Sequence, residues 1–132
     1  MNLEKLLYDF IEVRDSDIEG KGLFSLLELP LDTKIMVIEG EVIDEEECLK
    51  REYEENNVYI FWNDFNYIDT ANSSKLKYLN HSCNPNCYVA SRNSESLYLV
   101  SAKNISAGEE LTIDYGYEEI YENCKCNYCK NK

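Results

Sequence analysis

The sequence is poor in histidine and in long apolar runs, and each shortage excludes a class of protein. With His81 as its single histidine, the chain cannot form a metal site that needs two imidazoles. No stretch approaches the roughly 20 apolar residues that cross a bilayer, so we expect no membrane partner. Residues 1–10 lack a basic segment leading into an apolar one, so we expect no secretory signal.

Basic side chains are also few. The 132 residues include 13 lysines and arginines against 26 aspartates and glutamates, a formal charge of −13. This balance argues against a protein whose main act is to bind nucleic-acid phosphates. It favours basic partners, although negative charge could equally serve solubility alone.

What is present indicates one globular domain. The length suits a single compact unit. Apolar residues make up 44% of the chain and aromatic residues 12%, including eleven tyrosines, which is typical of a folded protein rather than a disordered one.

Short β-rich segments separated by turn residues predict a mostly β domain with short helices. Apolar residues between positions 3 and 11 have helical spacing, although residues 10–13 could equally form a strand. Residues 44–55 are polar, contain seven carboxylates and predict a solvated helix. The expected strands are residues 34–42, 58–62, 65–68, 87–91, 97–102 and 110–114.

Six cysteines suggest a metal site rather than disulfides, because disulfides require a secretory context. Cys124, Cys126 and Cys129 have the spacing i, i+2, i+5, which allows three thiolates to converge on one zinc ion. Cys83, Cys87 and Cys48 are each available as the fourth ligand of a tetrahedral site. The thiols also imply a reducing, intracellular compartment.

Residues 80–87 form a second candidate feature. They contain three asparagines, a proline and two cysteines, a composition that fits neither a regular strand nor a helix. Asparagine and histidine side chains give such a loop many donors and acceptors for a polar ligand. An ordinary turn capped by asparagine side chains is the simpler alternative.

Residues 109–117 form a third feature. Alternation places Leu111 and Ile113 on one face of a strand, and Tyr115 and Tyr117 continue that side beyond it. The tyrosines could line a pocket, but tyrosine is also common in β cores, and the pattern alone favours the core.

Taken together, these segments resemble the SET-domain family of protein lysine methyltransferases. Residues 80–86 read Asn-His-Ser-Cys-Asn-Pro-Asn, residues 110–115 read Glu-Leu-Thr-Ile-Asp-Tyr, and residues 20–24 read Gly-Lys-Gly-Leu-Phe. The cysteine tail is similar to the family's post-SET zinc motif. The resemblance implies a β fold whose C-terminal segment threads through a loop as a pseudoknot. It assigns residues 1–117 to the SET domain and residues 118–132 to a zinc-bound tail.

The resemblance also implies a site for S-adenosylmethionine and a lysine channel. The backbone at Lys21 and Gly22 and the side chains of Asn80 and His81 would contact the cofactor. Tyr115 matches the catalytic tyrosine, and Tyr59 and Tyr117 match tyrosines of the channel. The zinc ligands implied are Cys83, Cys124, Cys126 and Cys129, which leaves Cys87 less favoured and Cys48 an ordinary thiol.

The expected chemistry is transfer of a methyl group to a lysine amine, which needs little acid–base machinery. Only the neutral amine can attack, and desolvation in an aromatic channel lowers the lysine pKa. The resemblance implies a basic protein substrate, histone tails foremost, and a nuclear location in a eukaryote. The alternatives are a non-catalytic SET module that binds a peptide or partner protein, and an enzyme acting on a non-histone protein.

Three departures from the family pattern qualify the resemblance. Residues 75–77 replace the family's Gly-Asn…Arg approach to the asparagine-rich loop. Two residues, not four, separate Cys126 from Cys129. Ile113 stands where many members have a phenylalanine or tyrosine that governs the number of methyl groups, so the degree of methylation stays open.

Overall fold

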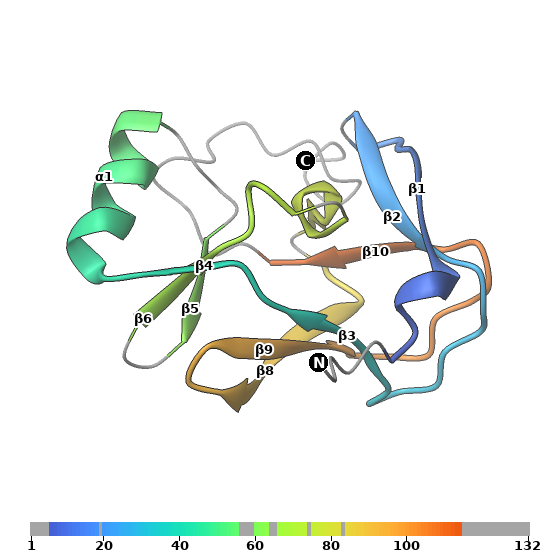
Figure 1. Cartoon of the computed structure of the whole chain (residues 1–132). Helices are drawn as coiled ribbons and strands as arrows, with labels where there is room; N and C mark the ends of the chain where they lie inside the picture. Colours follow the sequence, from blue (N-terminus) through green and yellow to red (C-terminus); the bar gives the residue numbers. More distant parts are fainter. Residues whose placement is uncertain are drawn as a thin grey trace.

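The fold is mostly β and is built from three small sheets. A computed structural model describes residues 6–18, 20–55, 60–63, 66–73, 75–82 and 84–114 (Figure 1). The four-stranded sheet has the order β1 (Ile11–Asp15), β2 (Lys21–Ser25), β10 (Glu110–Ile113), β7 (Asn80–His81). The second sheet has the order β3 (Lys34–Ile38), β9 (Ser96–Ser101), β8 (Cys87–Asn93), and the third β4 (Glu41–Ile43), β6 (Asn66–Asp69), β5 (Ile60–Asn63).

Helices are few within the described residues. They are α1 (Glu45–Glu55) and the 3-10 turns η1 (Tyr8–Phe10) and η2 (Leu76–Tyr78). No helix of this part of the chain is long and apolar enough to cross a membrane. The expected fold class, mostly β with short helices, is therefore confirmed.

The main core lies between the first and second sheets. Strand alternation turns Leu23 and Leu111 inward, and both are fully buried. They belong to one cluster with Ile35 and Leu99 from β3 and β9. Because Ile113 is also in this cluster, the predicted inward face of residues 110–113 is confirmed.

Helix α1 covers the third sheet and completes a second, smaller cluster. Cys48 of α1 packs there against Ile43 and Ile60. Arg51 adds ion pairs, with Nη1 2.9 Å from Glu41 Oε1 and 2.8 Å from Asp69 Oδ2. Figure 1 shows α1 at one end of the molecule, β1 and β2 at the other, and β10 crossing between them.

The structure decides one alternative and corrects two expectations from the sequence. Within the described residues, strand β1 begins at Ile11, directly after the 3-10 turn η1, so the strand alternative for residues 10–13 is confirmed. The segment 34–42 is split into β3 and β4, because β3 pairs with β9 whereas β4 pairs with β6 in another sheet. Gly40 lies between them, where a Cβ atom would collide with the Asp69 carbonyl. The asparagine-rich loop begins with a two-residue strand, since Asn80 and His81 pair in parallel with Thr112 and Ile113.

Candidate functional site

Strand β10 brings the three sequence motifs together. On one side, Glu110 and Leu111 pair with Phe24 and Leu23 of the glycine-containing segment. Further along the strand, Thr112 pairs with Asn80 of the asparagine-rich loop. Segments that are far apart in the sequence therefore meet in one sheet.

The Glu110 carboxylate is the centre of a polar cluster on the outer face of this sheet. Ser16 Oγ lies 2.8 Å from its Oε1 and donates a hydrogen bond to it. Asn80 Nδ2 lies 2.9 Å from Oε2 of the same carboxylate and 2.9 Å from the Lys21 carbonyl oxygen. These acceptors fix the orientation of the Asn80 amide before any ligand binds.

Gly22 leaves room for the Glu110 carboxylate in its observed position. A Cβ atom there would collide with the Glu110 carboxylate and lie 3.2 Å from Asn80 Nδ2. Without a side chain at position 22, the Glu110 carboxylate can lie across the strand and reach Asn80. The glycine thus makes room for the cluster that orients Asn80.

His81 is buried, with 6% of its surface exposed. Burial lowers the pKa of its imidazole, and the Asp114 carboxylate, 3.7 Å away, opposes that effect. The ring is therefore mainly neutral at pH 7.

Asn86 fastens the asparagine-rich loop to β10. Its Nδ2 donates to the Glu110 carbonyl oxygen at 2.7 Å, and its Oδ1 accepts from the Thr112 backbone nitrogen at 2.8 Å. Nδ2 also donates to the Glu109 carboxylate at 3.0 Å. The side-chain amide therefore satisfies backbone groups of β10 as a neighbouring strand would.

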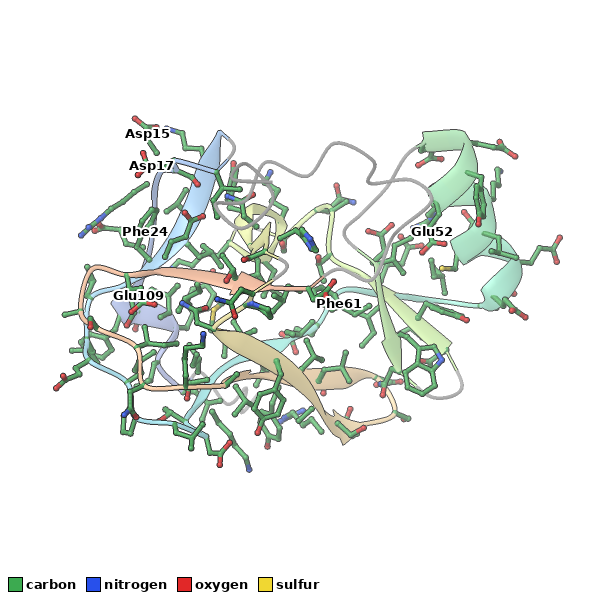
Figure 2. All side chains as sticks on the ribbon, turned by 180° about the vertical axis from the view of Figure 1, so that it is seen from behind. Asp15, Asp17, Phe24, Glu52, Phe61 and Glu109 are labelled. Carbon is green, nitrogen blue, oxygen red and sulfur yellow. The ribbon has the colours of Figure 1, made fainter. Side chains whose placement is uncertain are left out.

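A cavity of about 680 Å³ opens beside this cluster, within the size range of small-molecule sites. Asp15, Asp17, Phe24 and Glu109 lie along one side of the molecule in Figure 2. The full lining is Asp15, Asp17, Ile18, Phe24, Ser82, Asn84, Asn86, Lys103, Gly108, Glu109, Glu110 and Thr112. The four expected cofactor residues are not in this lining, and the cavity adjoins them through Glu110 and Ser82.

Lys21, Gly22 and Asn80 lie in contact, and His81 follows directly in the chain. The other expected site residues lie outside the described ranges; they are Tyr59, Cys83, Tyr115, Tyr117, Cys124, Cys126 and Cys129. Sequence reasoning gave no role to Ser16 or Asn86. Ser16 carries no sequence signal, whereas Asn86 ends the asparagine-rich motif and could have been singled out.

The two described cysteines, Cys48 and Cys87, are buried free thiols. Burial raises the pKa of both Cys48 and Cys87 to about 12, so each stays a protonated thiol. Within the described ranges, no group of three histidine, cysteine, aspartate or glutamate side chains could hold a metal ion.

Comparison with known proteins identifies the family. Residues 20–116 match the SET domain. Histone-lysine N-methyltransferase 2D from Homo sapiens is 36% identical over 112 residues, covering 78% of this chain and 2% of that protein. An H3 lysine-36 specific histone-lysine N-methyltransferase from Debaryomyces hansenii is 31% identical over 136 residues, covering 96% of this chain and 19% of that protein. Histone-lysine N-methyltransferase trithorax from Drosophila virilis is 30% identical over 139 residues, covering 98% and 4% respectively.

The chain belongs to the SET domain family. It spans only a small part, 2% to 19%, of the length of these three relatives. The match of residues 20–116 confirms the family resemblance read from the sequence motifs.

The Asn86 contacts generate a stability prediction. Replacing Asn86 by alanine removes four side-chain hydrogen bonds at a residue that is only 6% exposed, and leaves backbone groups of β10 unpaired. We expect the free energy of unfolding to fall by about 2 kcal/mol in urea denaturation. Asn84→Ala, in the same loop but at an exposed position, should change it by less than about 0.5 kcal/mol. Equal effects of the two changes would contradict the role given to Asn86.

Proposed function

We propose that this chain is an S-adenosylmethionine-dependent protein-lysine N-methyltransferase, with histone tails as the leading substrate class. The observation that carries the proposal is the polar cluster of Glu110, Asn80 and Lys21, which joins the three motifs of the family in one site. The printed names of the relatives describe enzymes that modify histone lysines, which supports the same activity here.

The described residues suit the cofactor. SET methyltransferases use S-adenosylmethionine, whose sulfonium group supplies the methyl group when the cofactor is bound. The Lys21 side chain is turned toward Asp15, with Nζ 2.8 Å from Oδ1, which leaves the backbone at Lys21 and Gly22 as the contact surface. Asn80 adds an amide already oriented by Glu110, and the neighbouring cavity gives room for a ligand of this size.

The substrate amine would be prepared by the aromatic channel. Asp114 follows β10, and Tyr115 comes next in the chain, one residue beyond the carboxylate that lies near His81. We assign Tyr115 the role of orienting the lysine amine, with Tyr59 and Tyr117 as channel walls. Desolvation there lowers the lysine pKa from about 10.4, and alignment of the reactants supplies much of the remaining rate.

Charge supports a basic protein substrate. The net charge of −13 favours approach of lysine- and arginine-rich segments. A histone tail has this character, and a eukaryotic source would then imply a location on chromatin. The proposal includes no direct contact with nucleic acid.

We also propose one structural zinc ion in a tail of residues 118–132, following a SET domain of residues 1–117. Its ligands would be Cys83 and the cluster Cys124, Cys126 and Cys129. The chemistry of four thiolates suits tetrahedral zinc and leaves no open position for catalysis. Cys83 is next to Ser82, whose backbone nitrogen donates to the Ile113 carbonyl oxygen at 2.9 Å, so the ion would lie close to β10.

Labelled methyl transfer to a panel of histones and other basic proteins tests the activity. We expect incorporation into lysine, and we expect Tyr115→Phe to lower the rate by about 100-fold because one positioned hydroxyl is lost. Cofactor affinity measured by calorimetry should stay within about threefold. Tyr88→Phe is the matched control: that exposed tyrosine donates to Asp32, neither residue lines the cavity, and the change should leave the rate unchanged.

Two results would reject parts of this proposal. Absence of both transfer and cofactor binding in the wild-type protein would favour a non-catalytic SET module. Full activity of Tyr115→Phe would remove the role of Tyr115 while leaving the enzyme class intact.

Zinc has a separate test. Elemental analysis should find about one zinc per chain, and removal by a chelator should expose four thiols to alkylation. Cys48 and Cys87 should stay unmodified until the protein unfolds, because both are buried and protonated. Alkylation of Cys87 in place of Cys83 after chelation would show that the fourth ligand is assigned wrongly.

A further inference from the structure

Lys75 makes an unusual set of contacts just before the asparagine-rich loop. Its Nζ donates to the carbonyl oxygens of Tyr8 and Ile11, both at 2.7 Å. The same ammonium lies 4.0 Å from the centroid of the Tyr8 ring. Lys75 belongs to the segment that departs from the family pattern, so the family motifs give it no role.

These contacts are strong enough to hold two segments together. Hydrogen bonds from an ammonium are charge-assisted and about twice as strong as neutral ones. A cation over an aromatic ring adds to them. Because Lys75 is half-buried, water screens these interactions only in part.

The segments joined in this way are the start of β1 and the turn η2. The turn continues from Lys75, since the Tyr78 backbone nitrogen donates to the Lys75 carbonyl oxygen at 2.8 Å. The Leu79 nitrogen then donates to the Leu76 carbonyl oxygen at 3.0 Å, and Asn80 follows directly. Lys75 is therefore linked to Asn80 through one short, hydrogen-bonded turn.

Strand β1, at the other end of the Lys75 tether, is also linked to Asn80. Ile11 begins β1, which pairs with β2 through to Asp15 opposite Lys21. Asn80 Nδ2 donates to the Lys21 carbonyl oxygen. The tether, the turn, Asn80, β2 and β1 thus form a closed ring of contacts, and Lys75 closes it.

We propose that Lys75 is a positioning residue: it ties the start of β1 to η2 and so sets the position of Asn80 and His81 for the cofactor. Its effect on methyl transfer rests on the proposed function, whereas its effect on the loop does not. The segment 8–11 is then part of the site's support, although it contacts no reacting atom.

Amide hydrogen exchange of the free protein tests the tether without any cofactor. In Lys75→Met, which keeps an apolar stem and loses the ammonium, we expect the amides of Tyr78, Leu79 and Ser82 to exchange about tenfold faster. Amides paired between β8 and β9 should keep their rates. Lys77→Met is the matched control: it removes a charge from the same turn, where the ammonium lies 5.3 Å over the Tyr78 ring, and should leave these rates unchanged.

The same variants have a functional readout. Well below the unfolding temperature, Lys75→Met should weaken cofactor binding about five- to tenfold, and Lys75→Arg should restore it to within about threefold because a guanidinium can donate to both carbonyls. Lys77→Met should bind normally. If Lys75→Met does not fold, Tyr8→Leu can replace it. This change keeps both backbone acceptors and removes the ring with its hydroxyl, and it should raise the exchange rates of the same amides by a smaller factor.

The outcomes separate the two proposals. Unchanged exchange at Tyr78, Leu79 and Ser82 would overturn the positioning role. An equal acceleration of exchange across all three sheets would also overturn it, because that result indicates only a loss of global stability. Local acceleration in a protein whose wild type binds no cofactor would keep the tether and reject the proposed function.

Discussion

Strand β10 is the element on which the site depends, because its backbone must be satisfied on both edges. Strand β2 pairs with Glu110 and Leu111, β7 pairs with Thr112 and Ile113, and the Asn86 side chain binds the remaining backbone groups of Glu110 and Thr112. Meeting this requirement brings Asn80 beside Glu110 and draws Ser16 to a residue 94 positions away in the chain. The geometry of the candidate cofactor site therefore follows from how one buried four-residue strand completes its hydrogen bonds.

Sequence reasoning could identify the parts of this arrangement that are local. Composition and motif order indicated the family, and alternation located β10 and placed Leu111 in the core. It could not find β7, since Asn80 and His81 become a strand only when β10 lies alongside them. The break between β3 and β4 was missed for a similar reason, because it depends on pairing with two different strands, β9 and β6, which has no local signal.

The acidic charge has more than one use. Asp44 caps α1 by accepting from the Glu47 nitrogen at 2.9 Å, and Glu47 in turn accepts from Arg51 at 2.7 Å. Hydrogen bonds to Glu41, Asp69 and Glu47 raise the pKa of the Arg51 guanidinium, so Arg51 stays charged within α1. Part of the negative charge thus stabilises the fold, and only the remainder is available to attract a basic substrate.

Lys21, Gly22, Asn80 and His81 are proposed to form one cofactor site. The most direct test is to titrate the protein with S-adenosylhomocysteine, the product of methyl donation, and to monitor the amide chemical shifts at each step. We expect saturable shifts concentrated at residues 20–23 and 80–82. We also expect Glu110→Gln to bind about tenfold more weakly, because the Asn80 amide loses its charged acceptor. Shifts confined to the sheet of β3, β9 and β8 or to α1, or no shifts at millimolar ligand, would contradict this proposal.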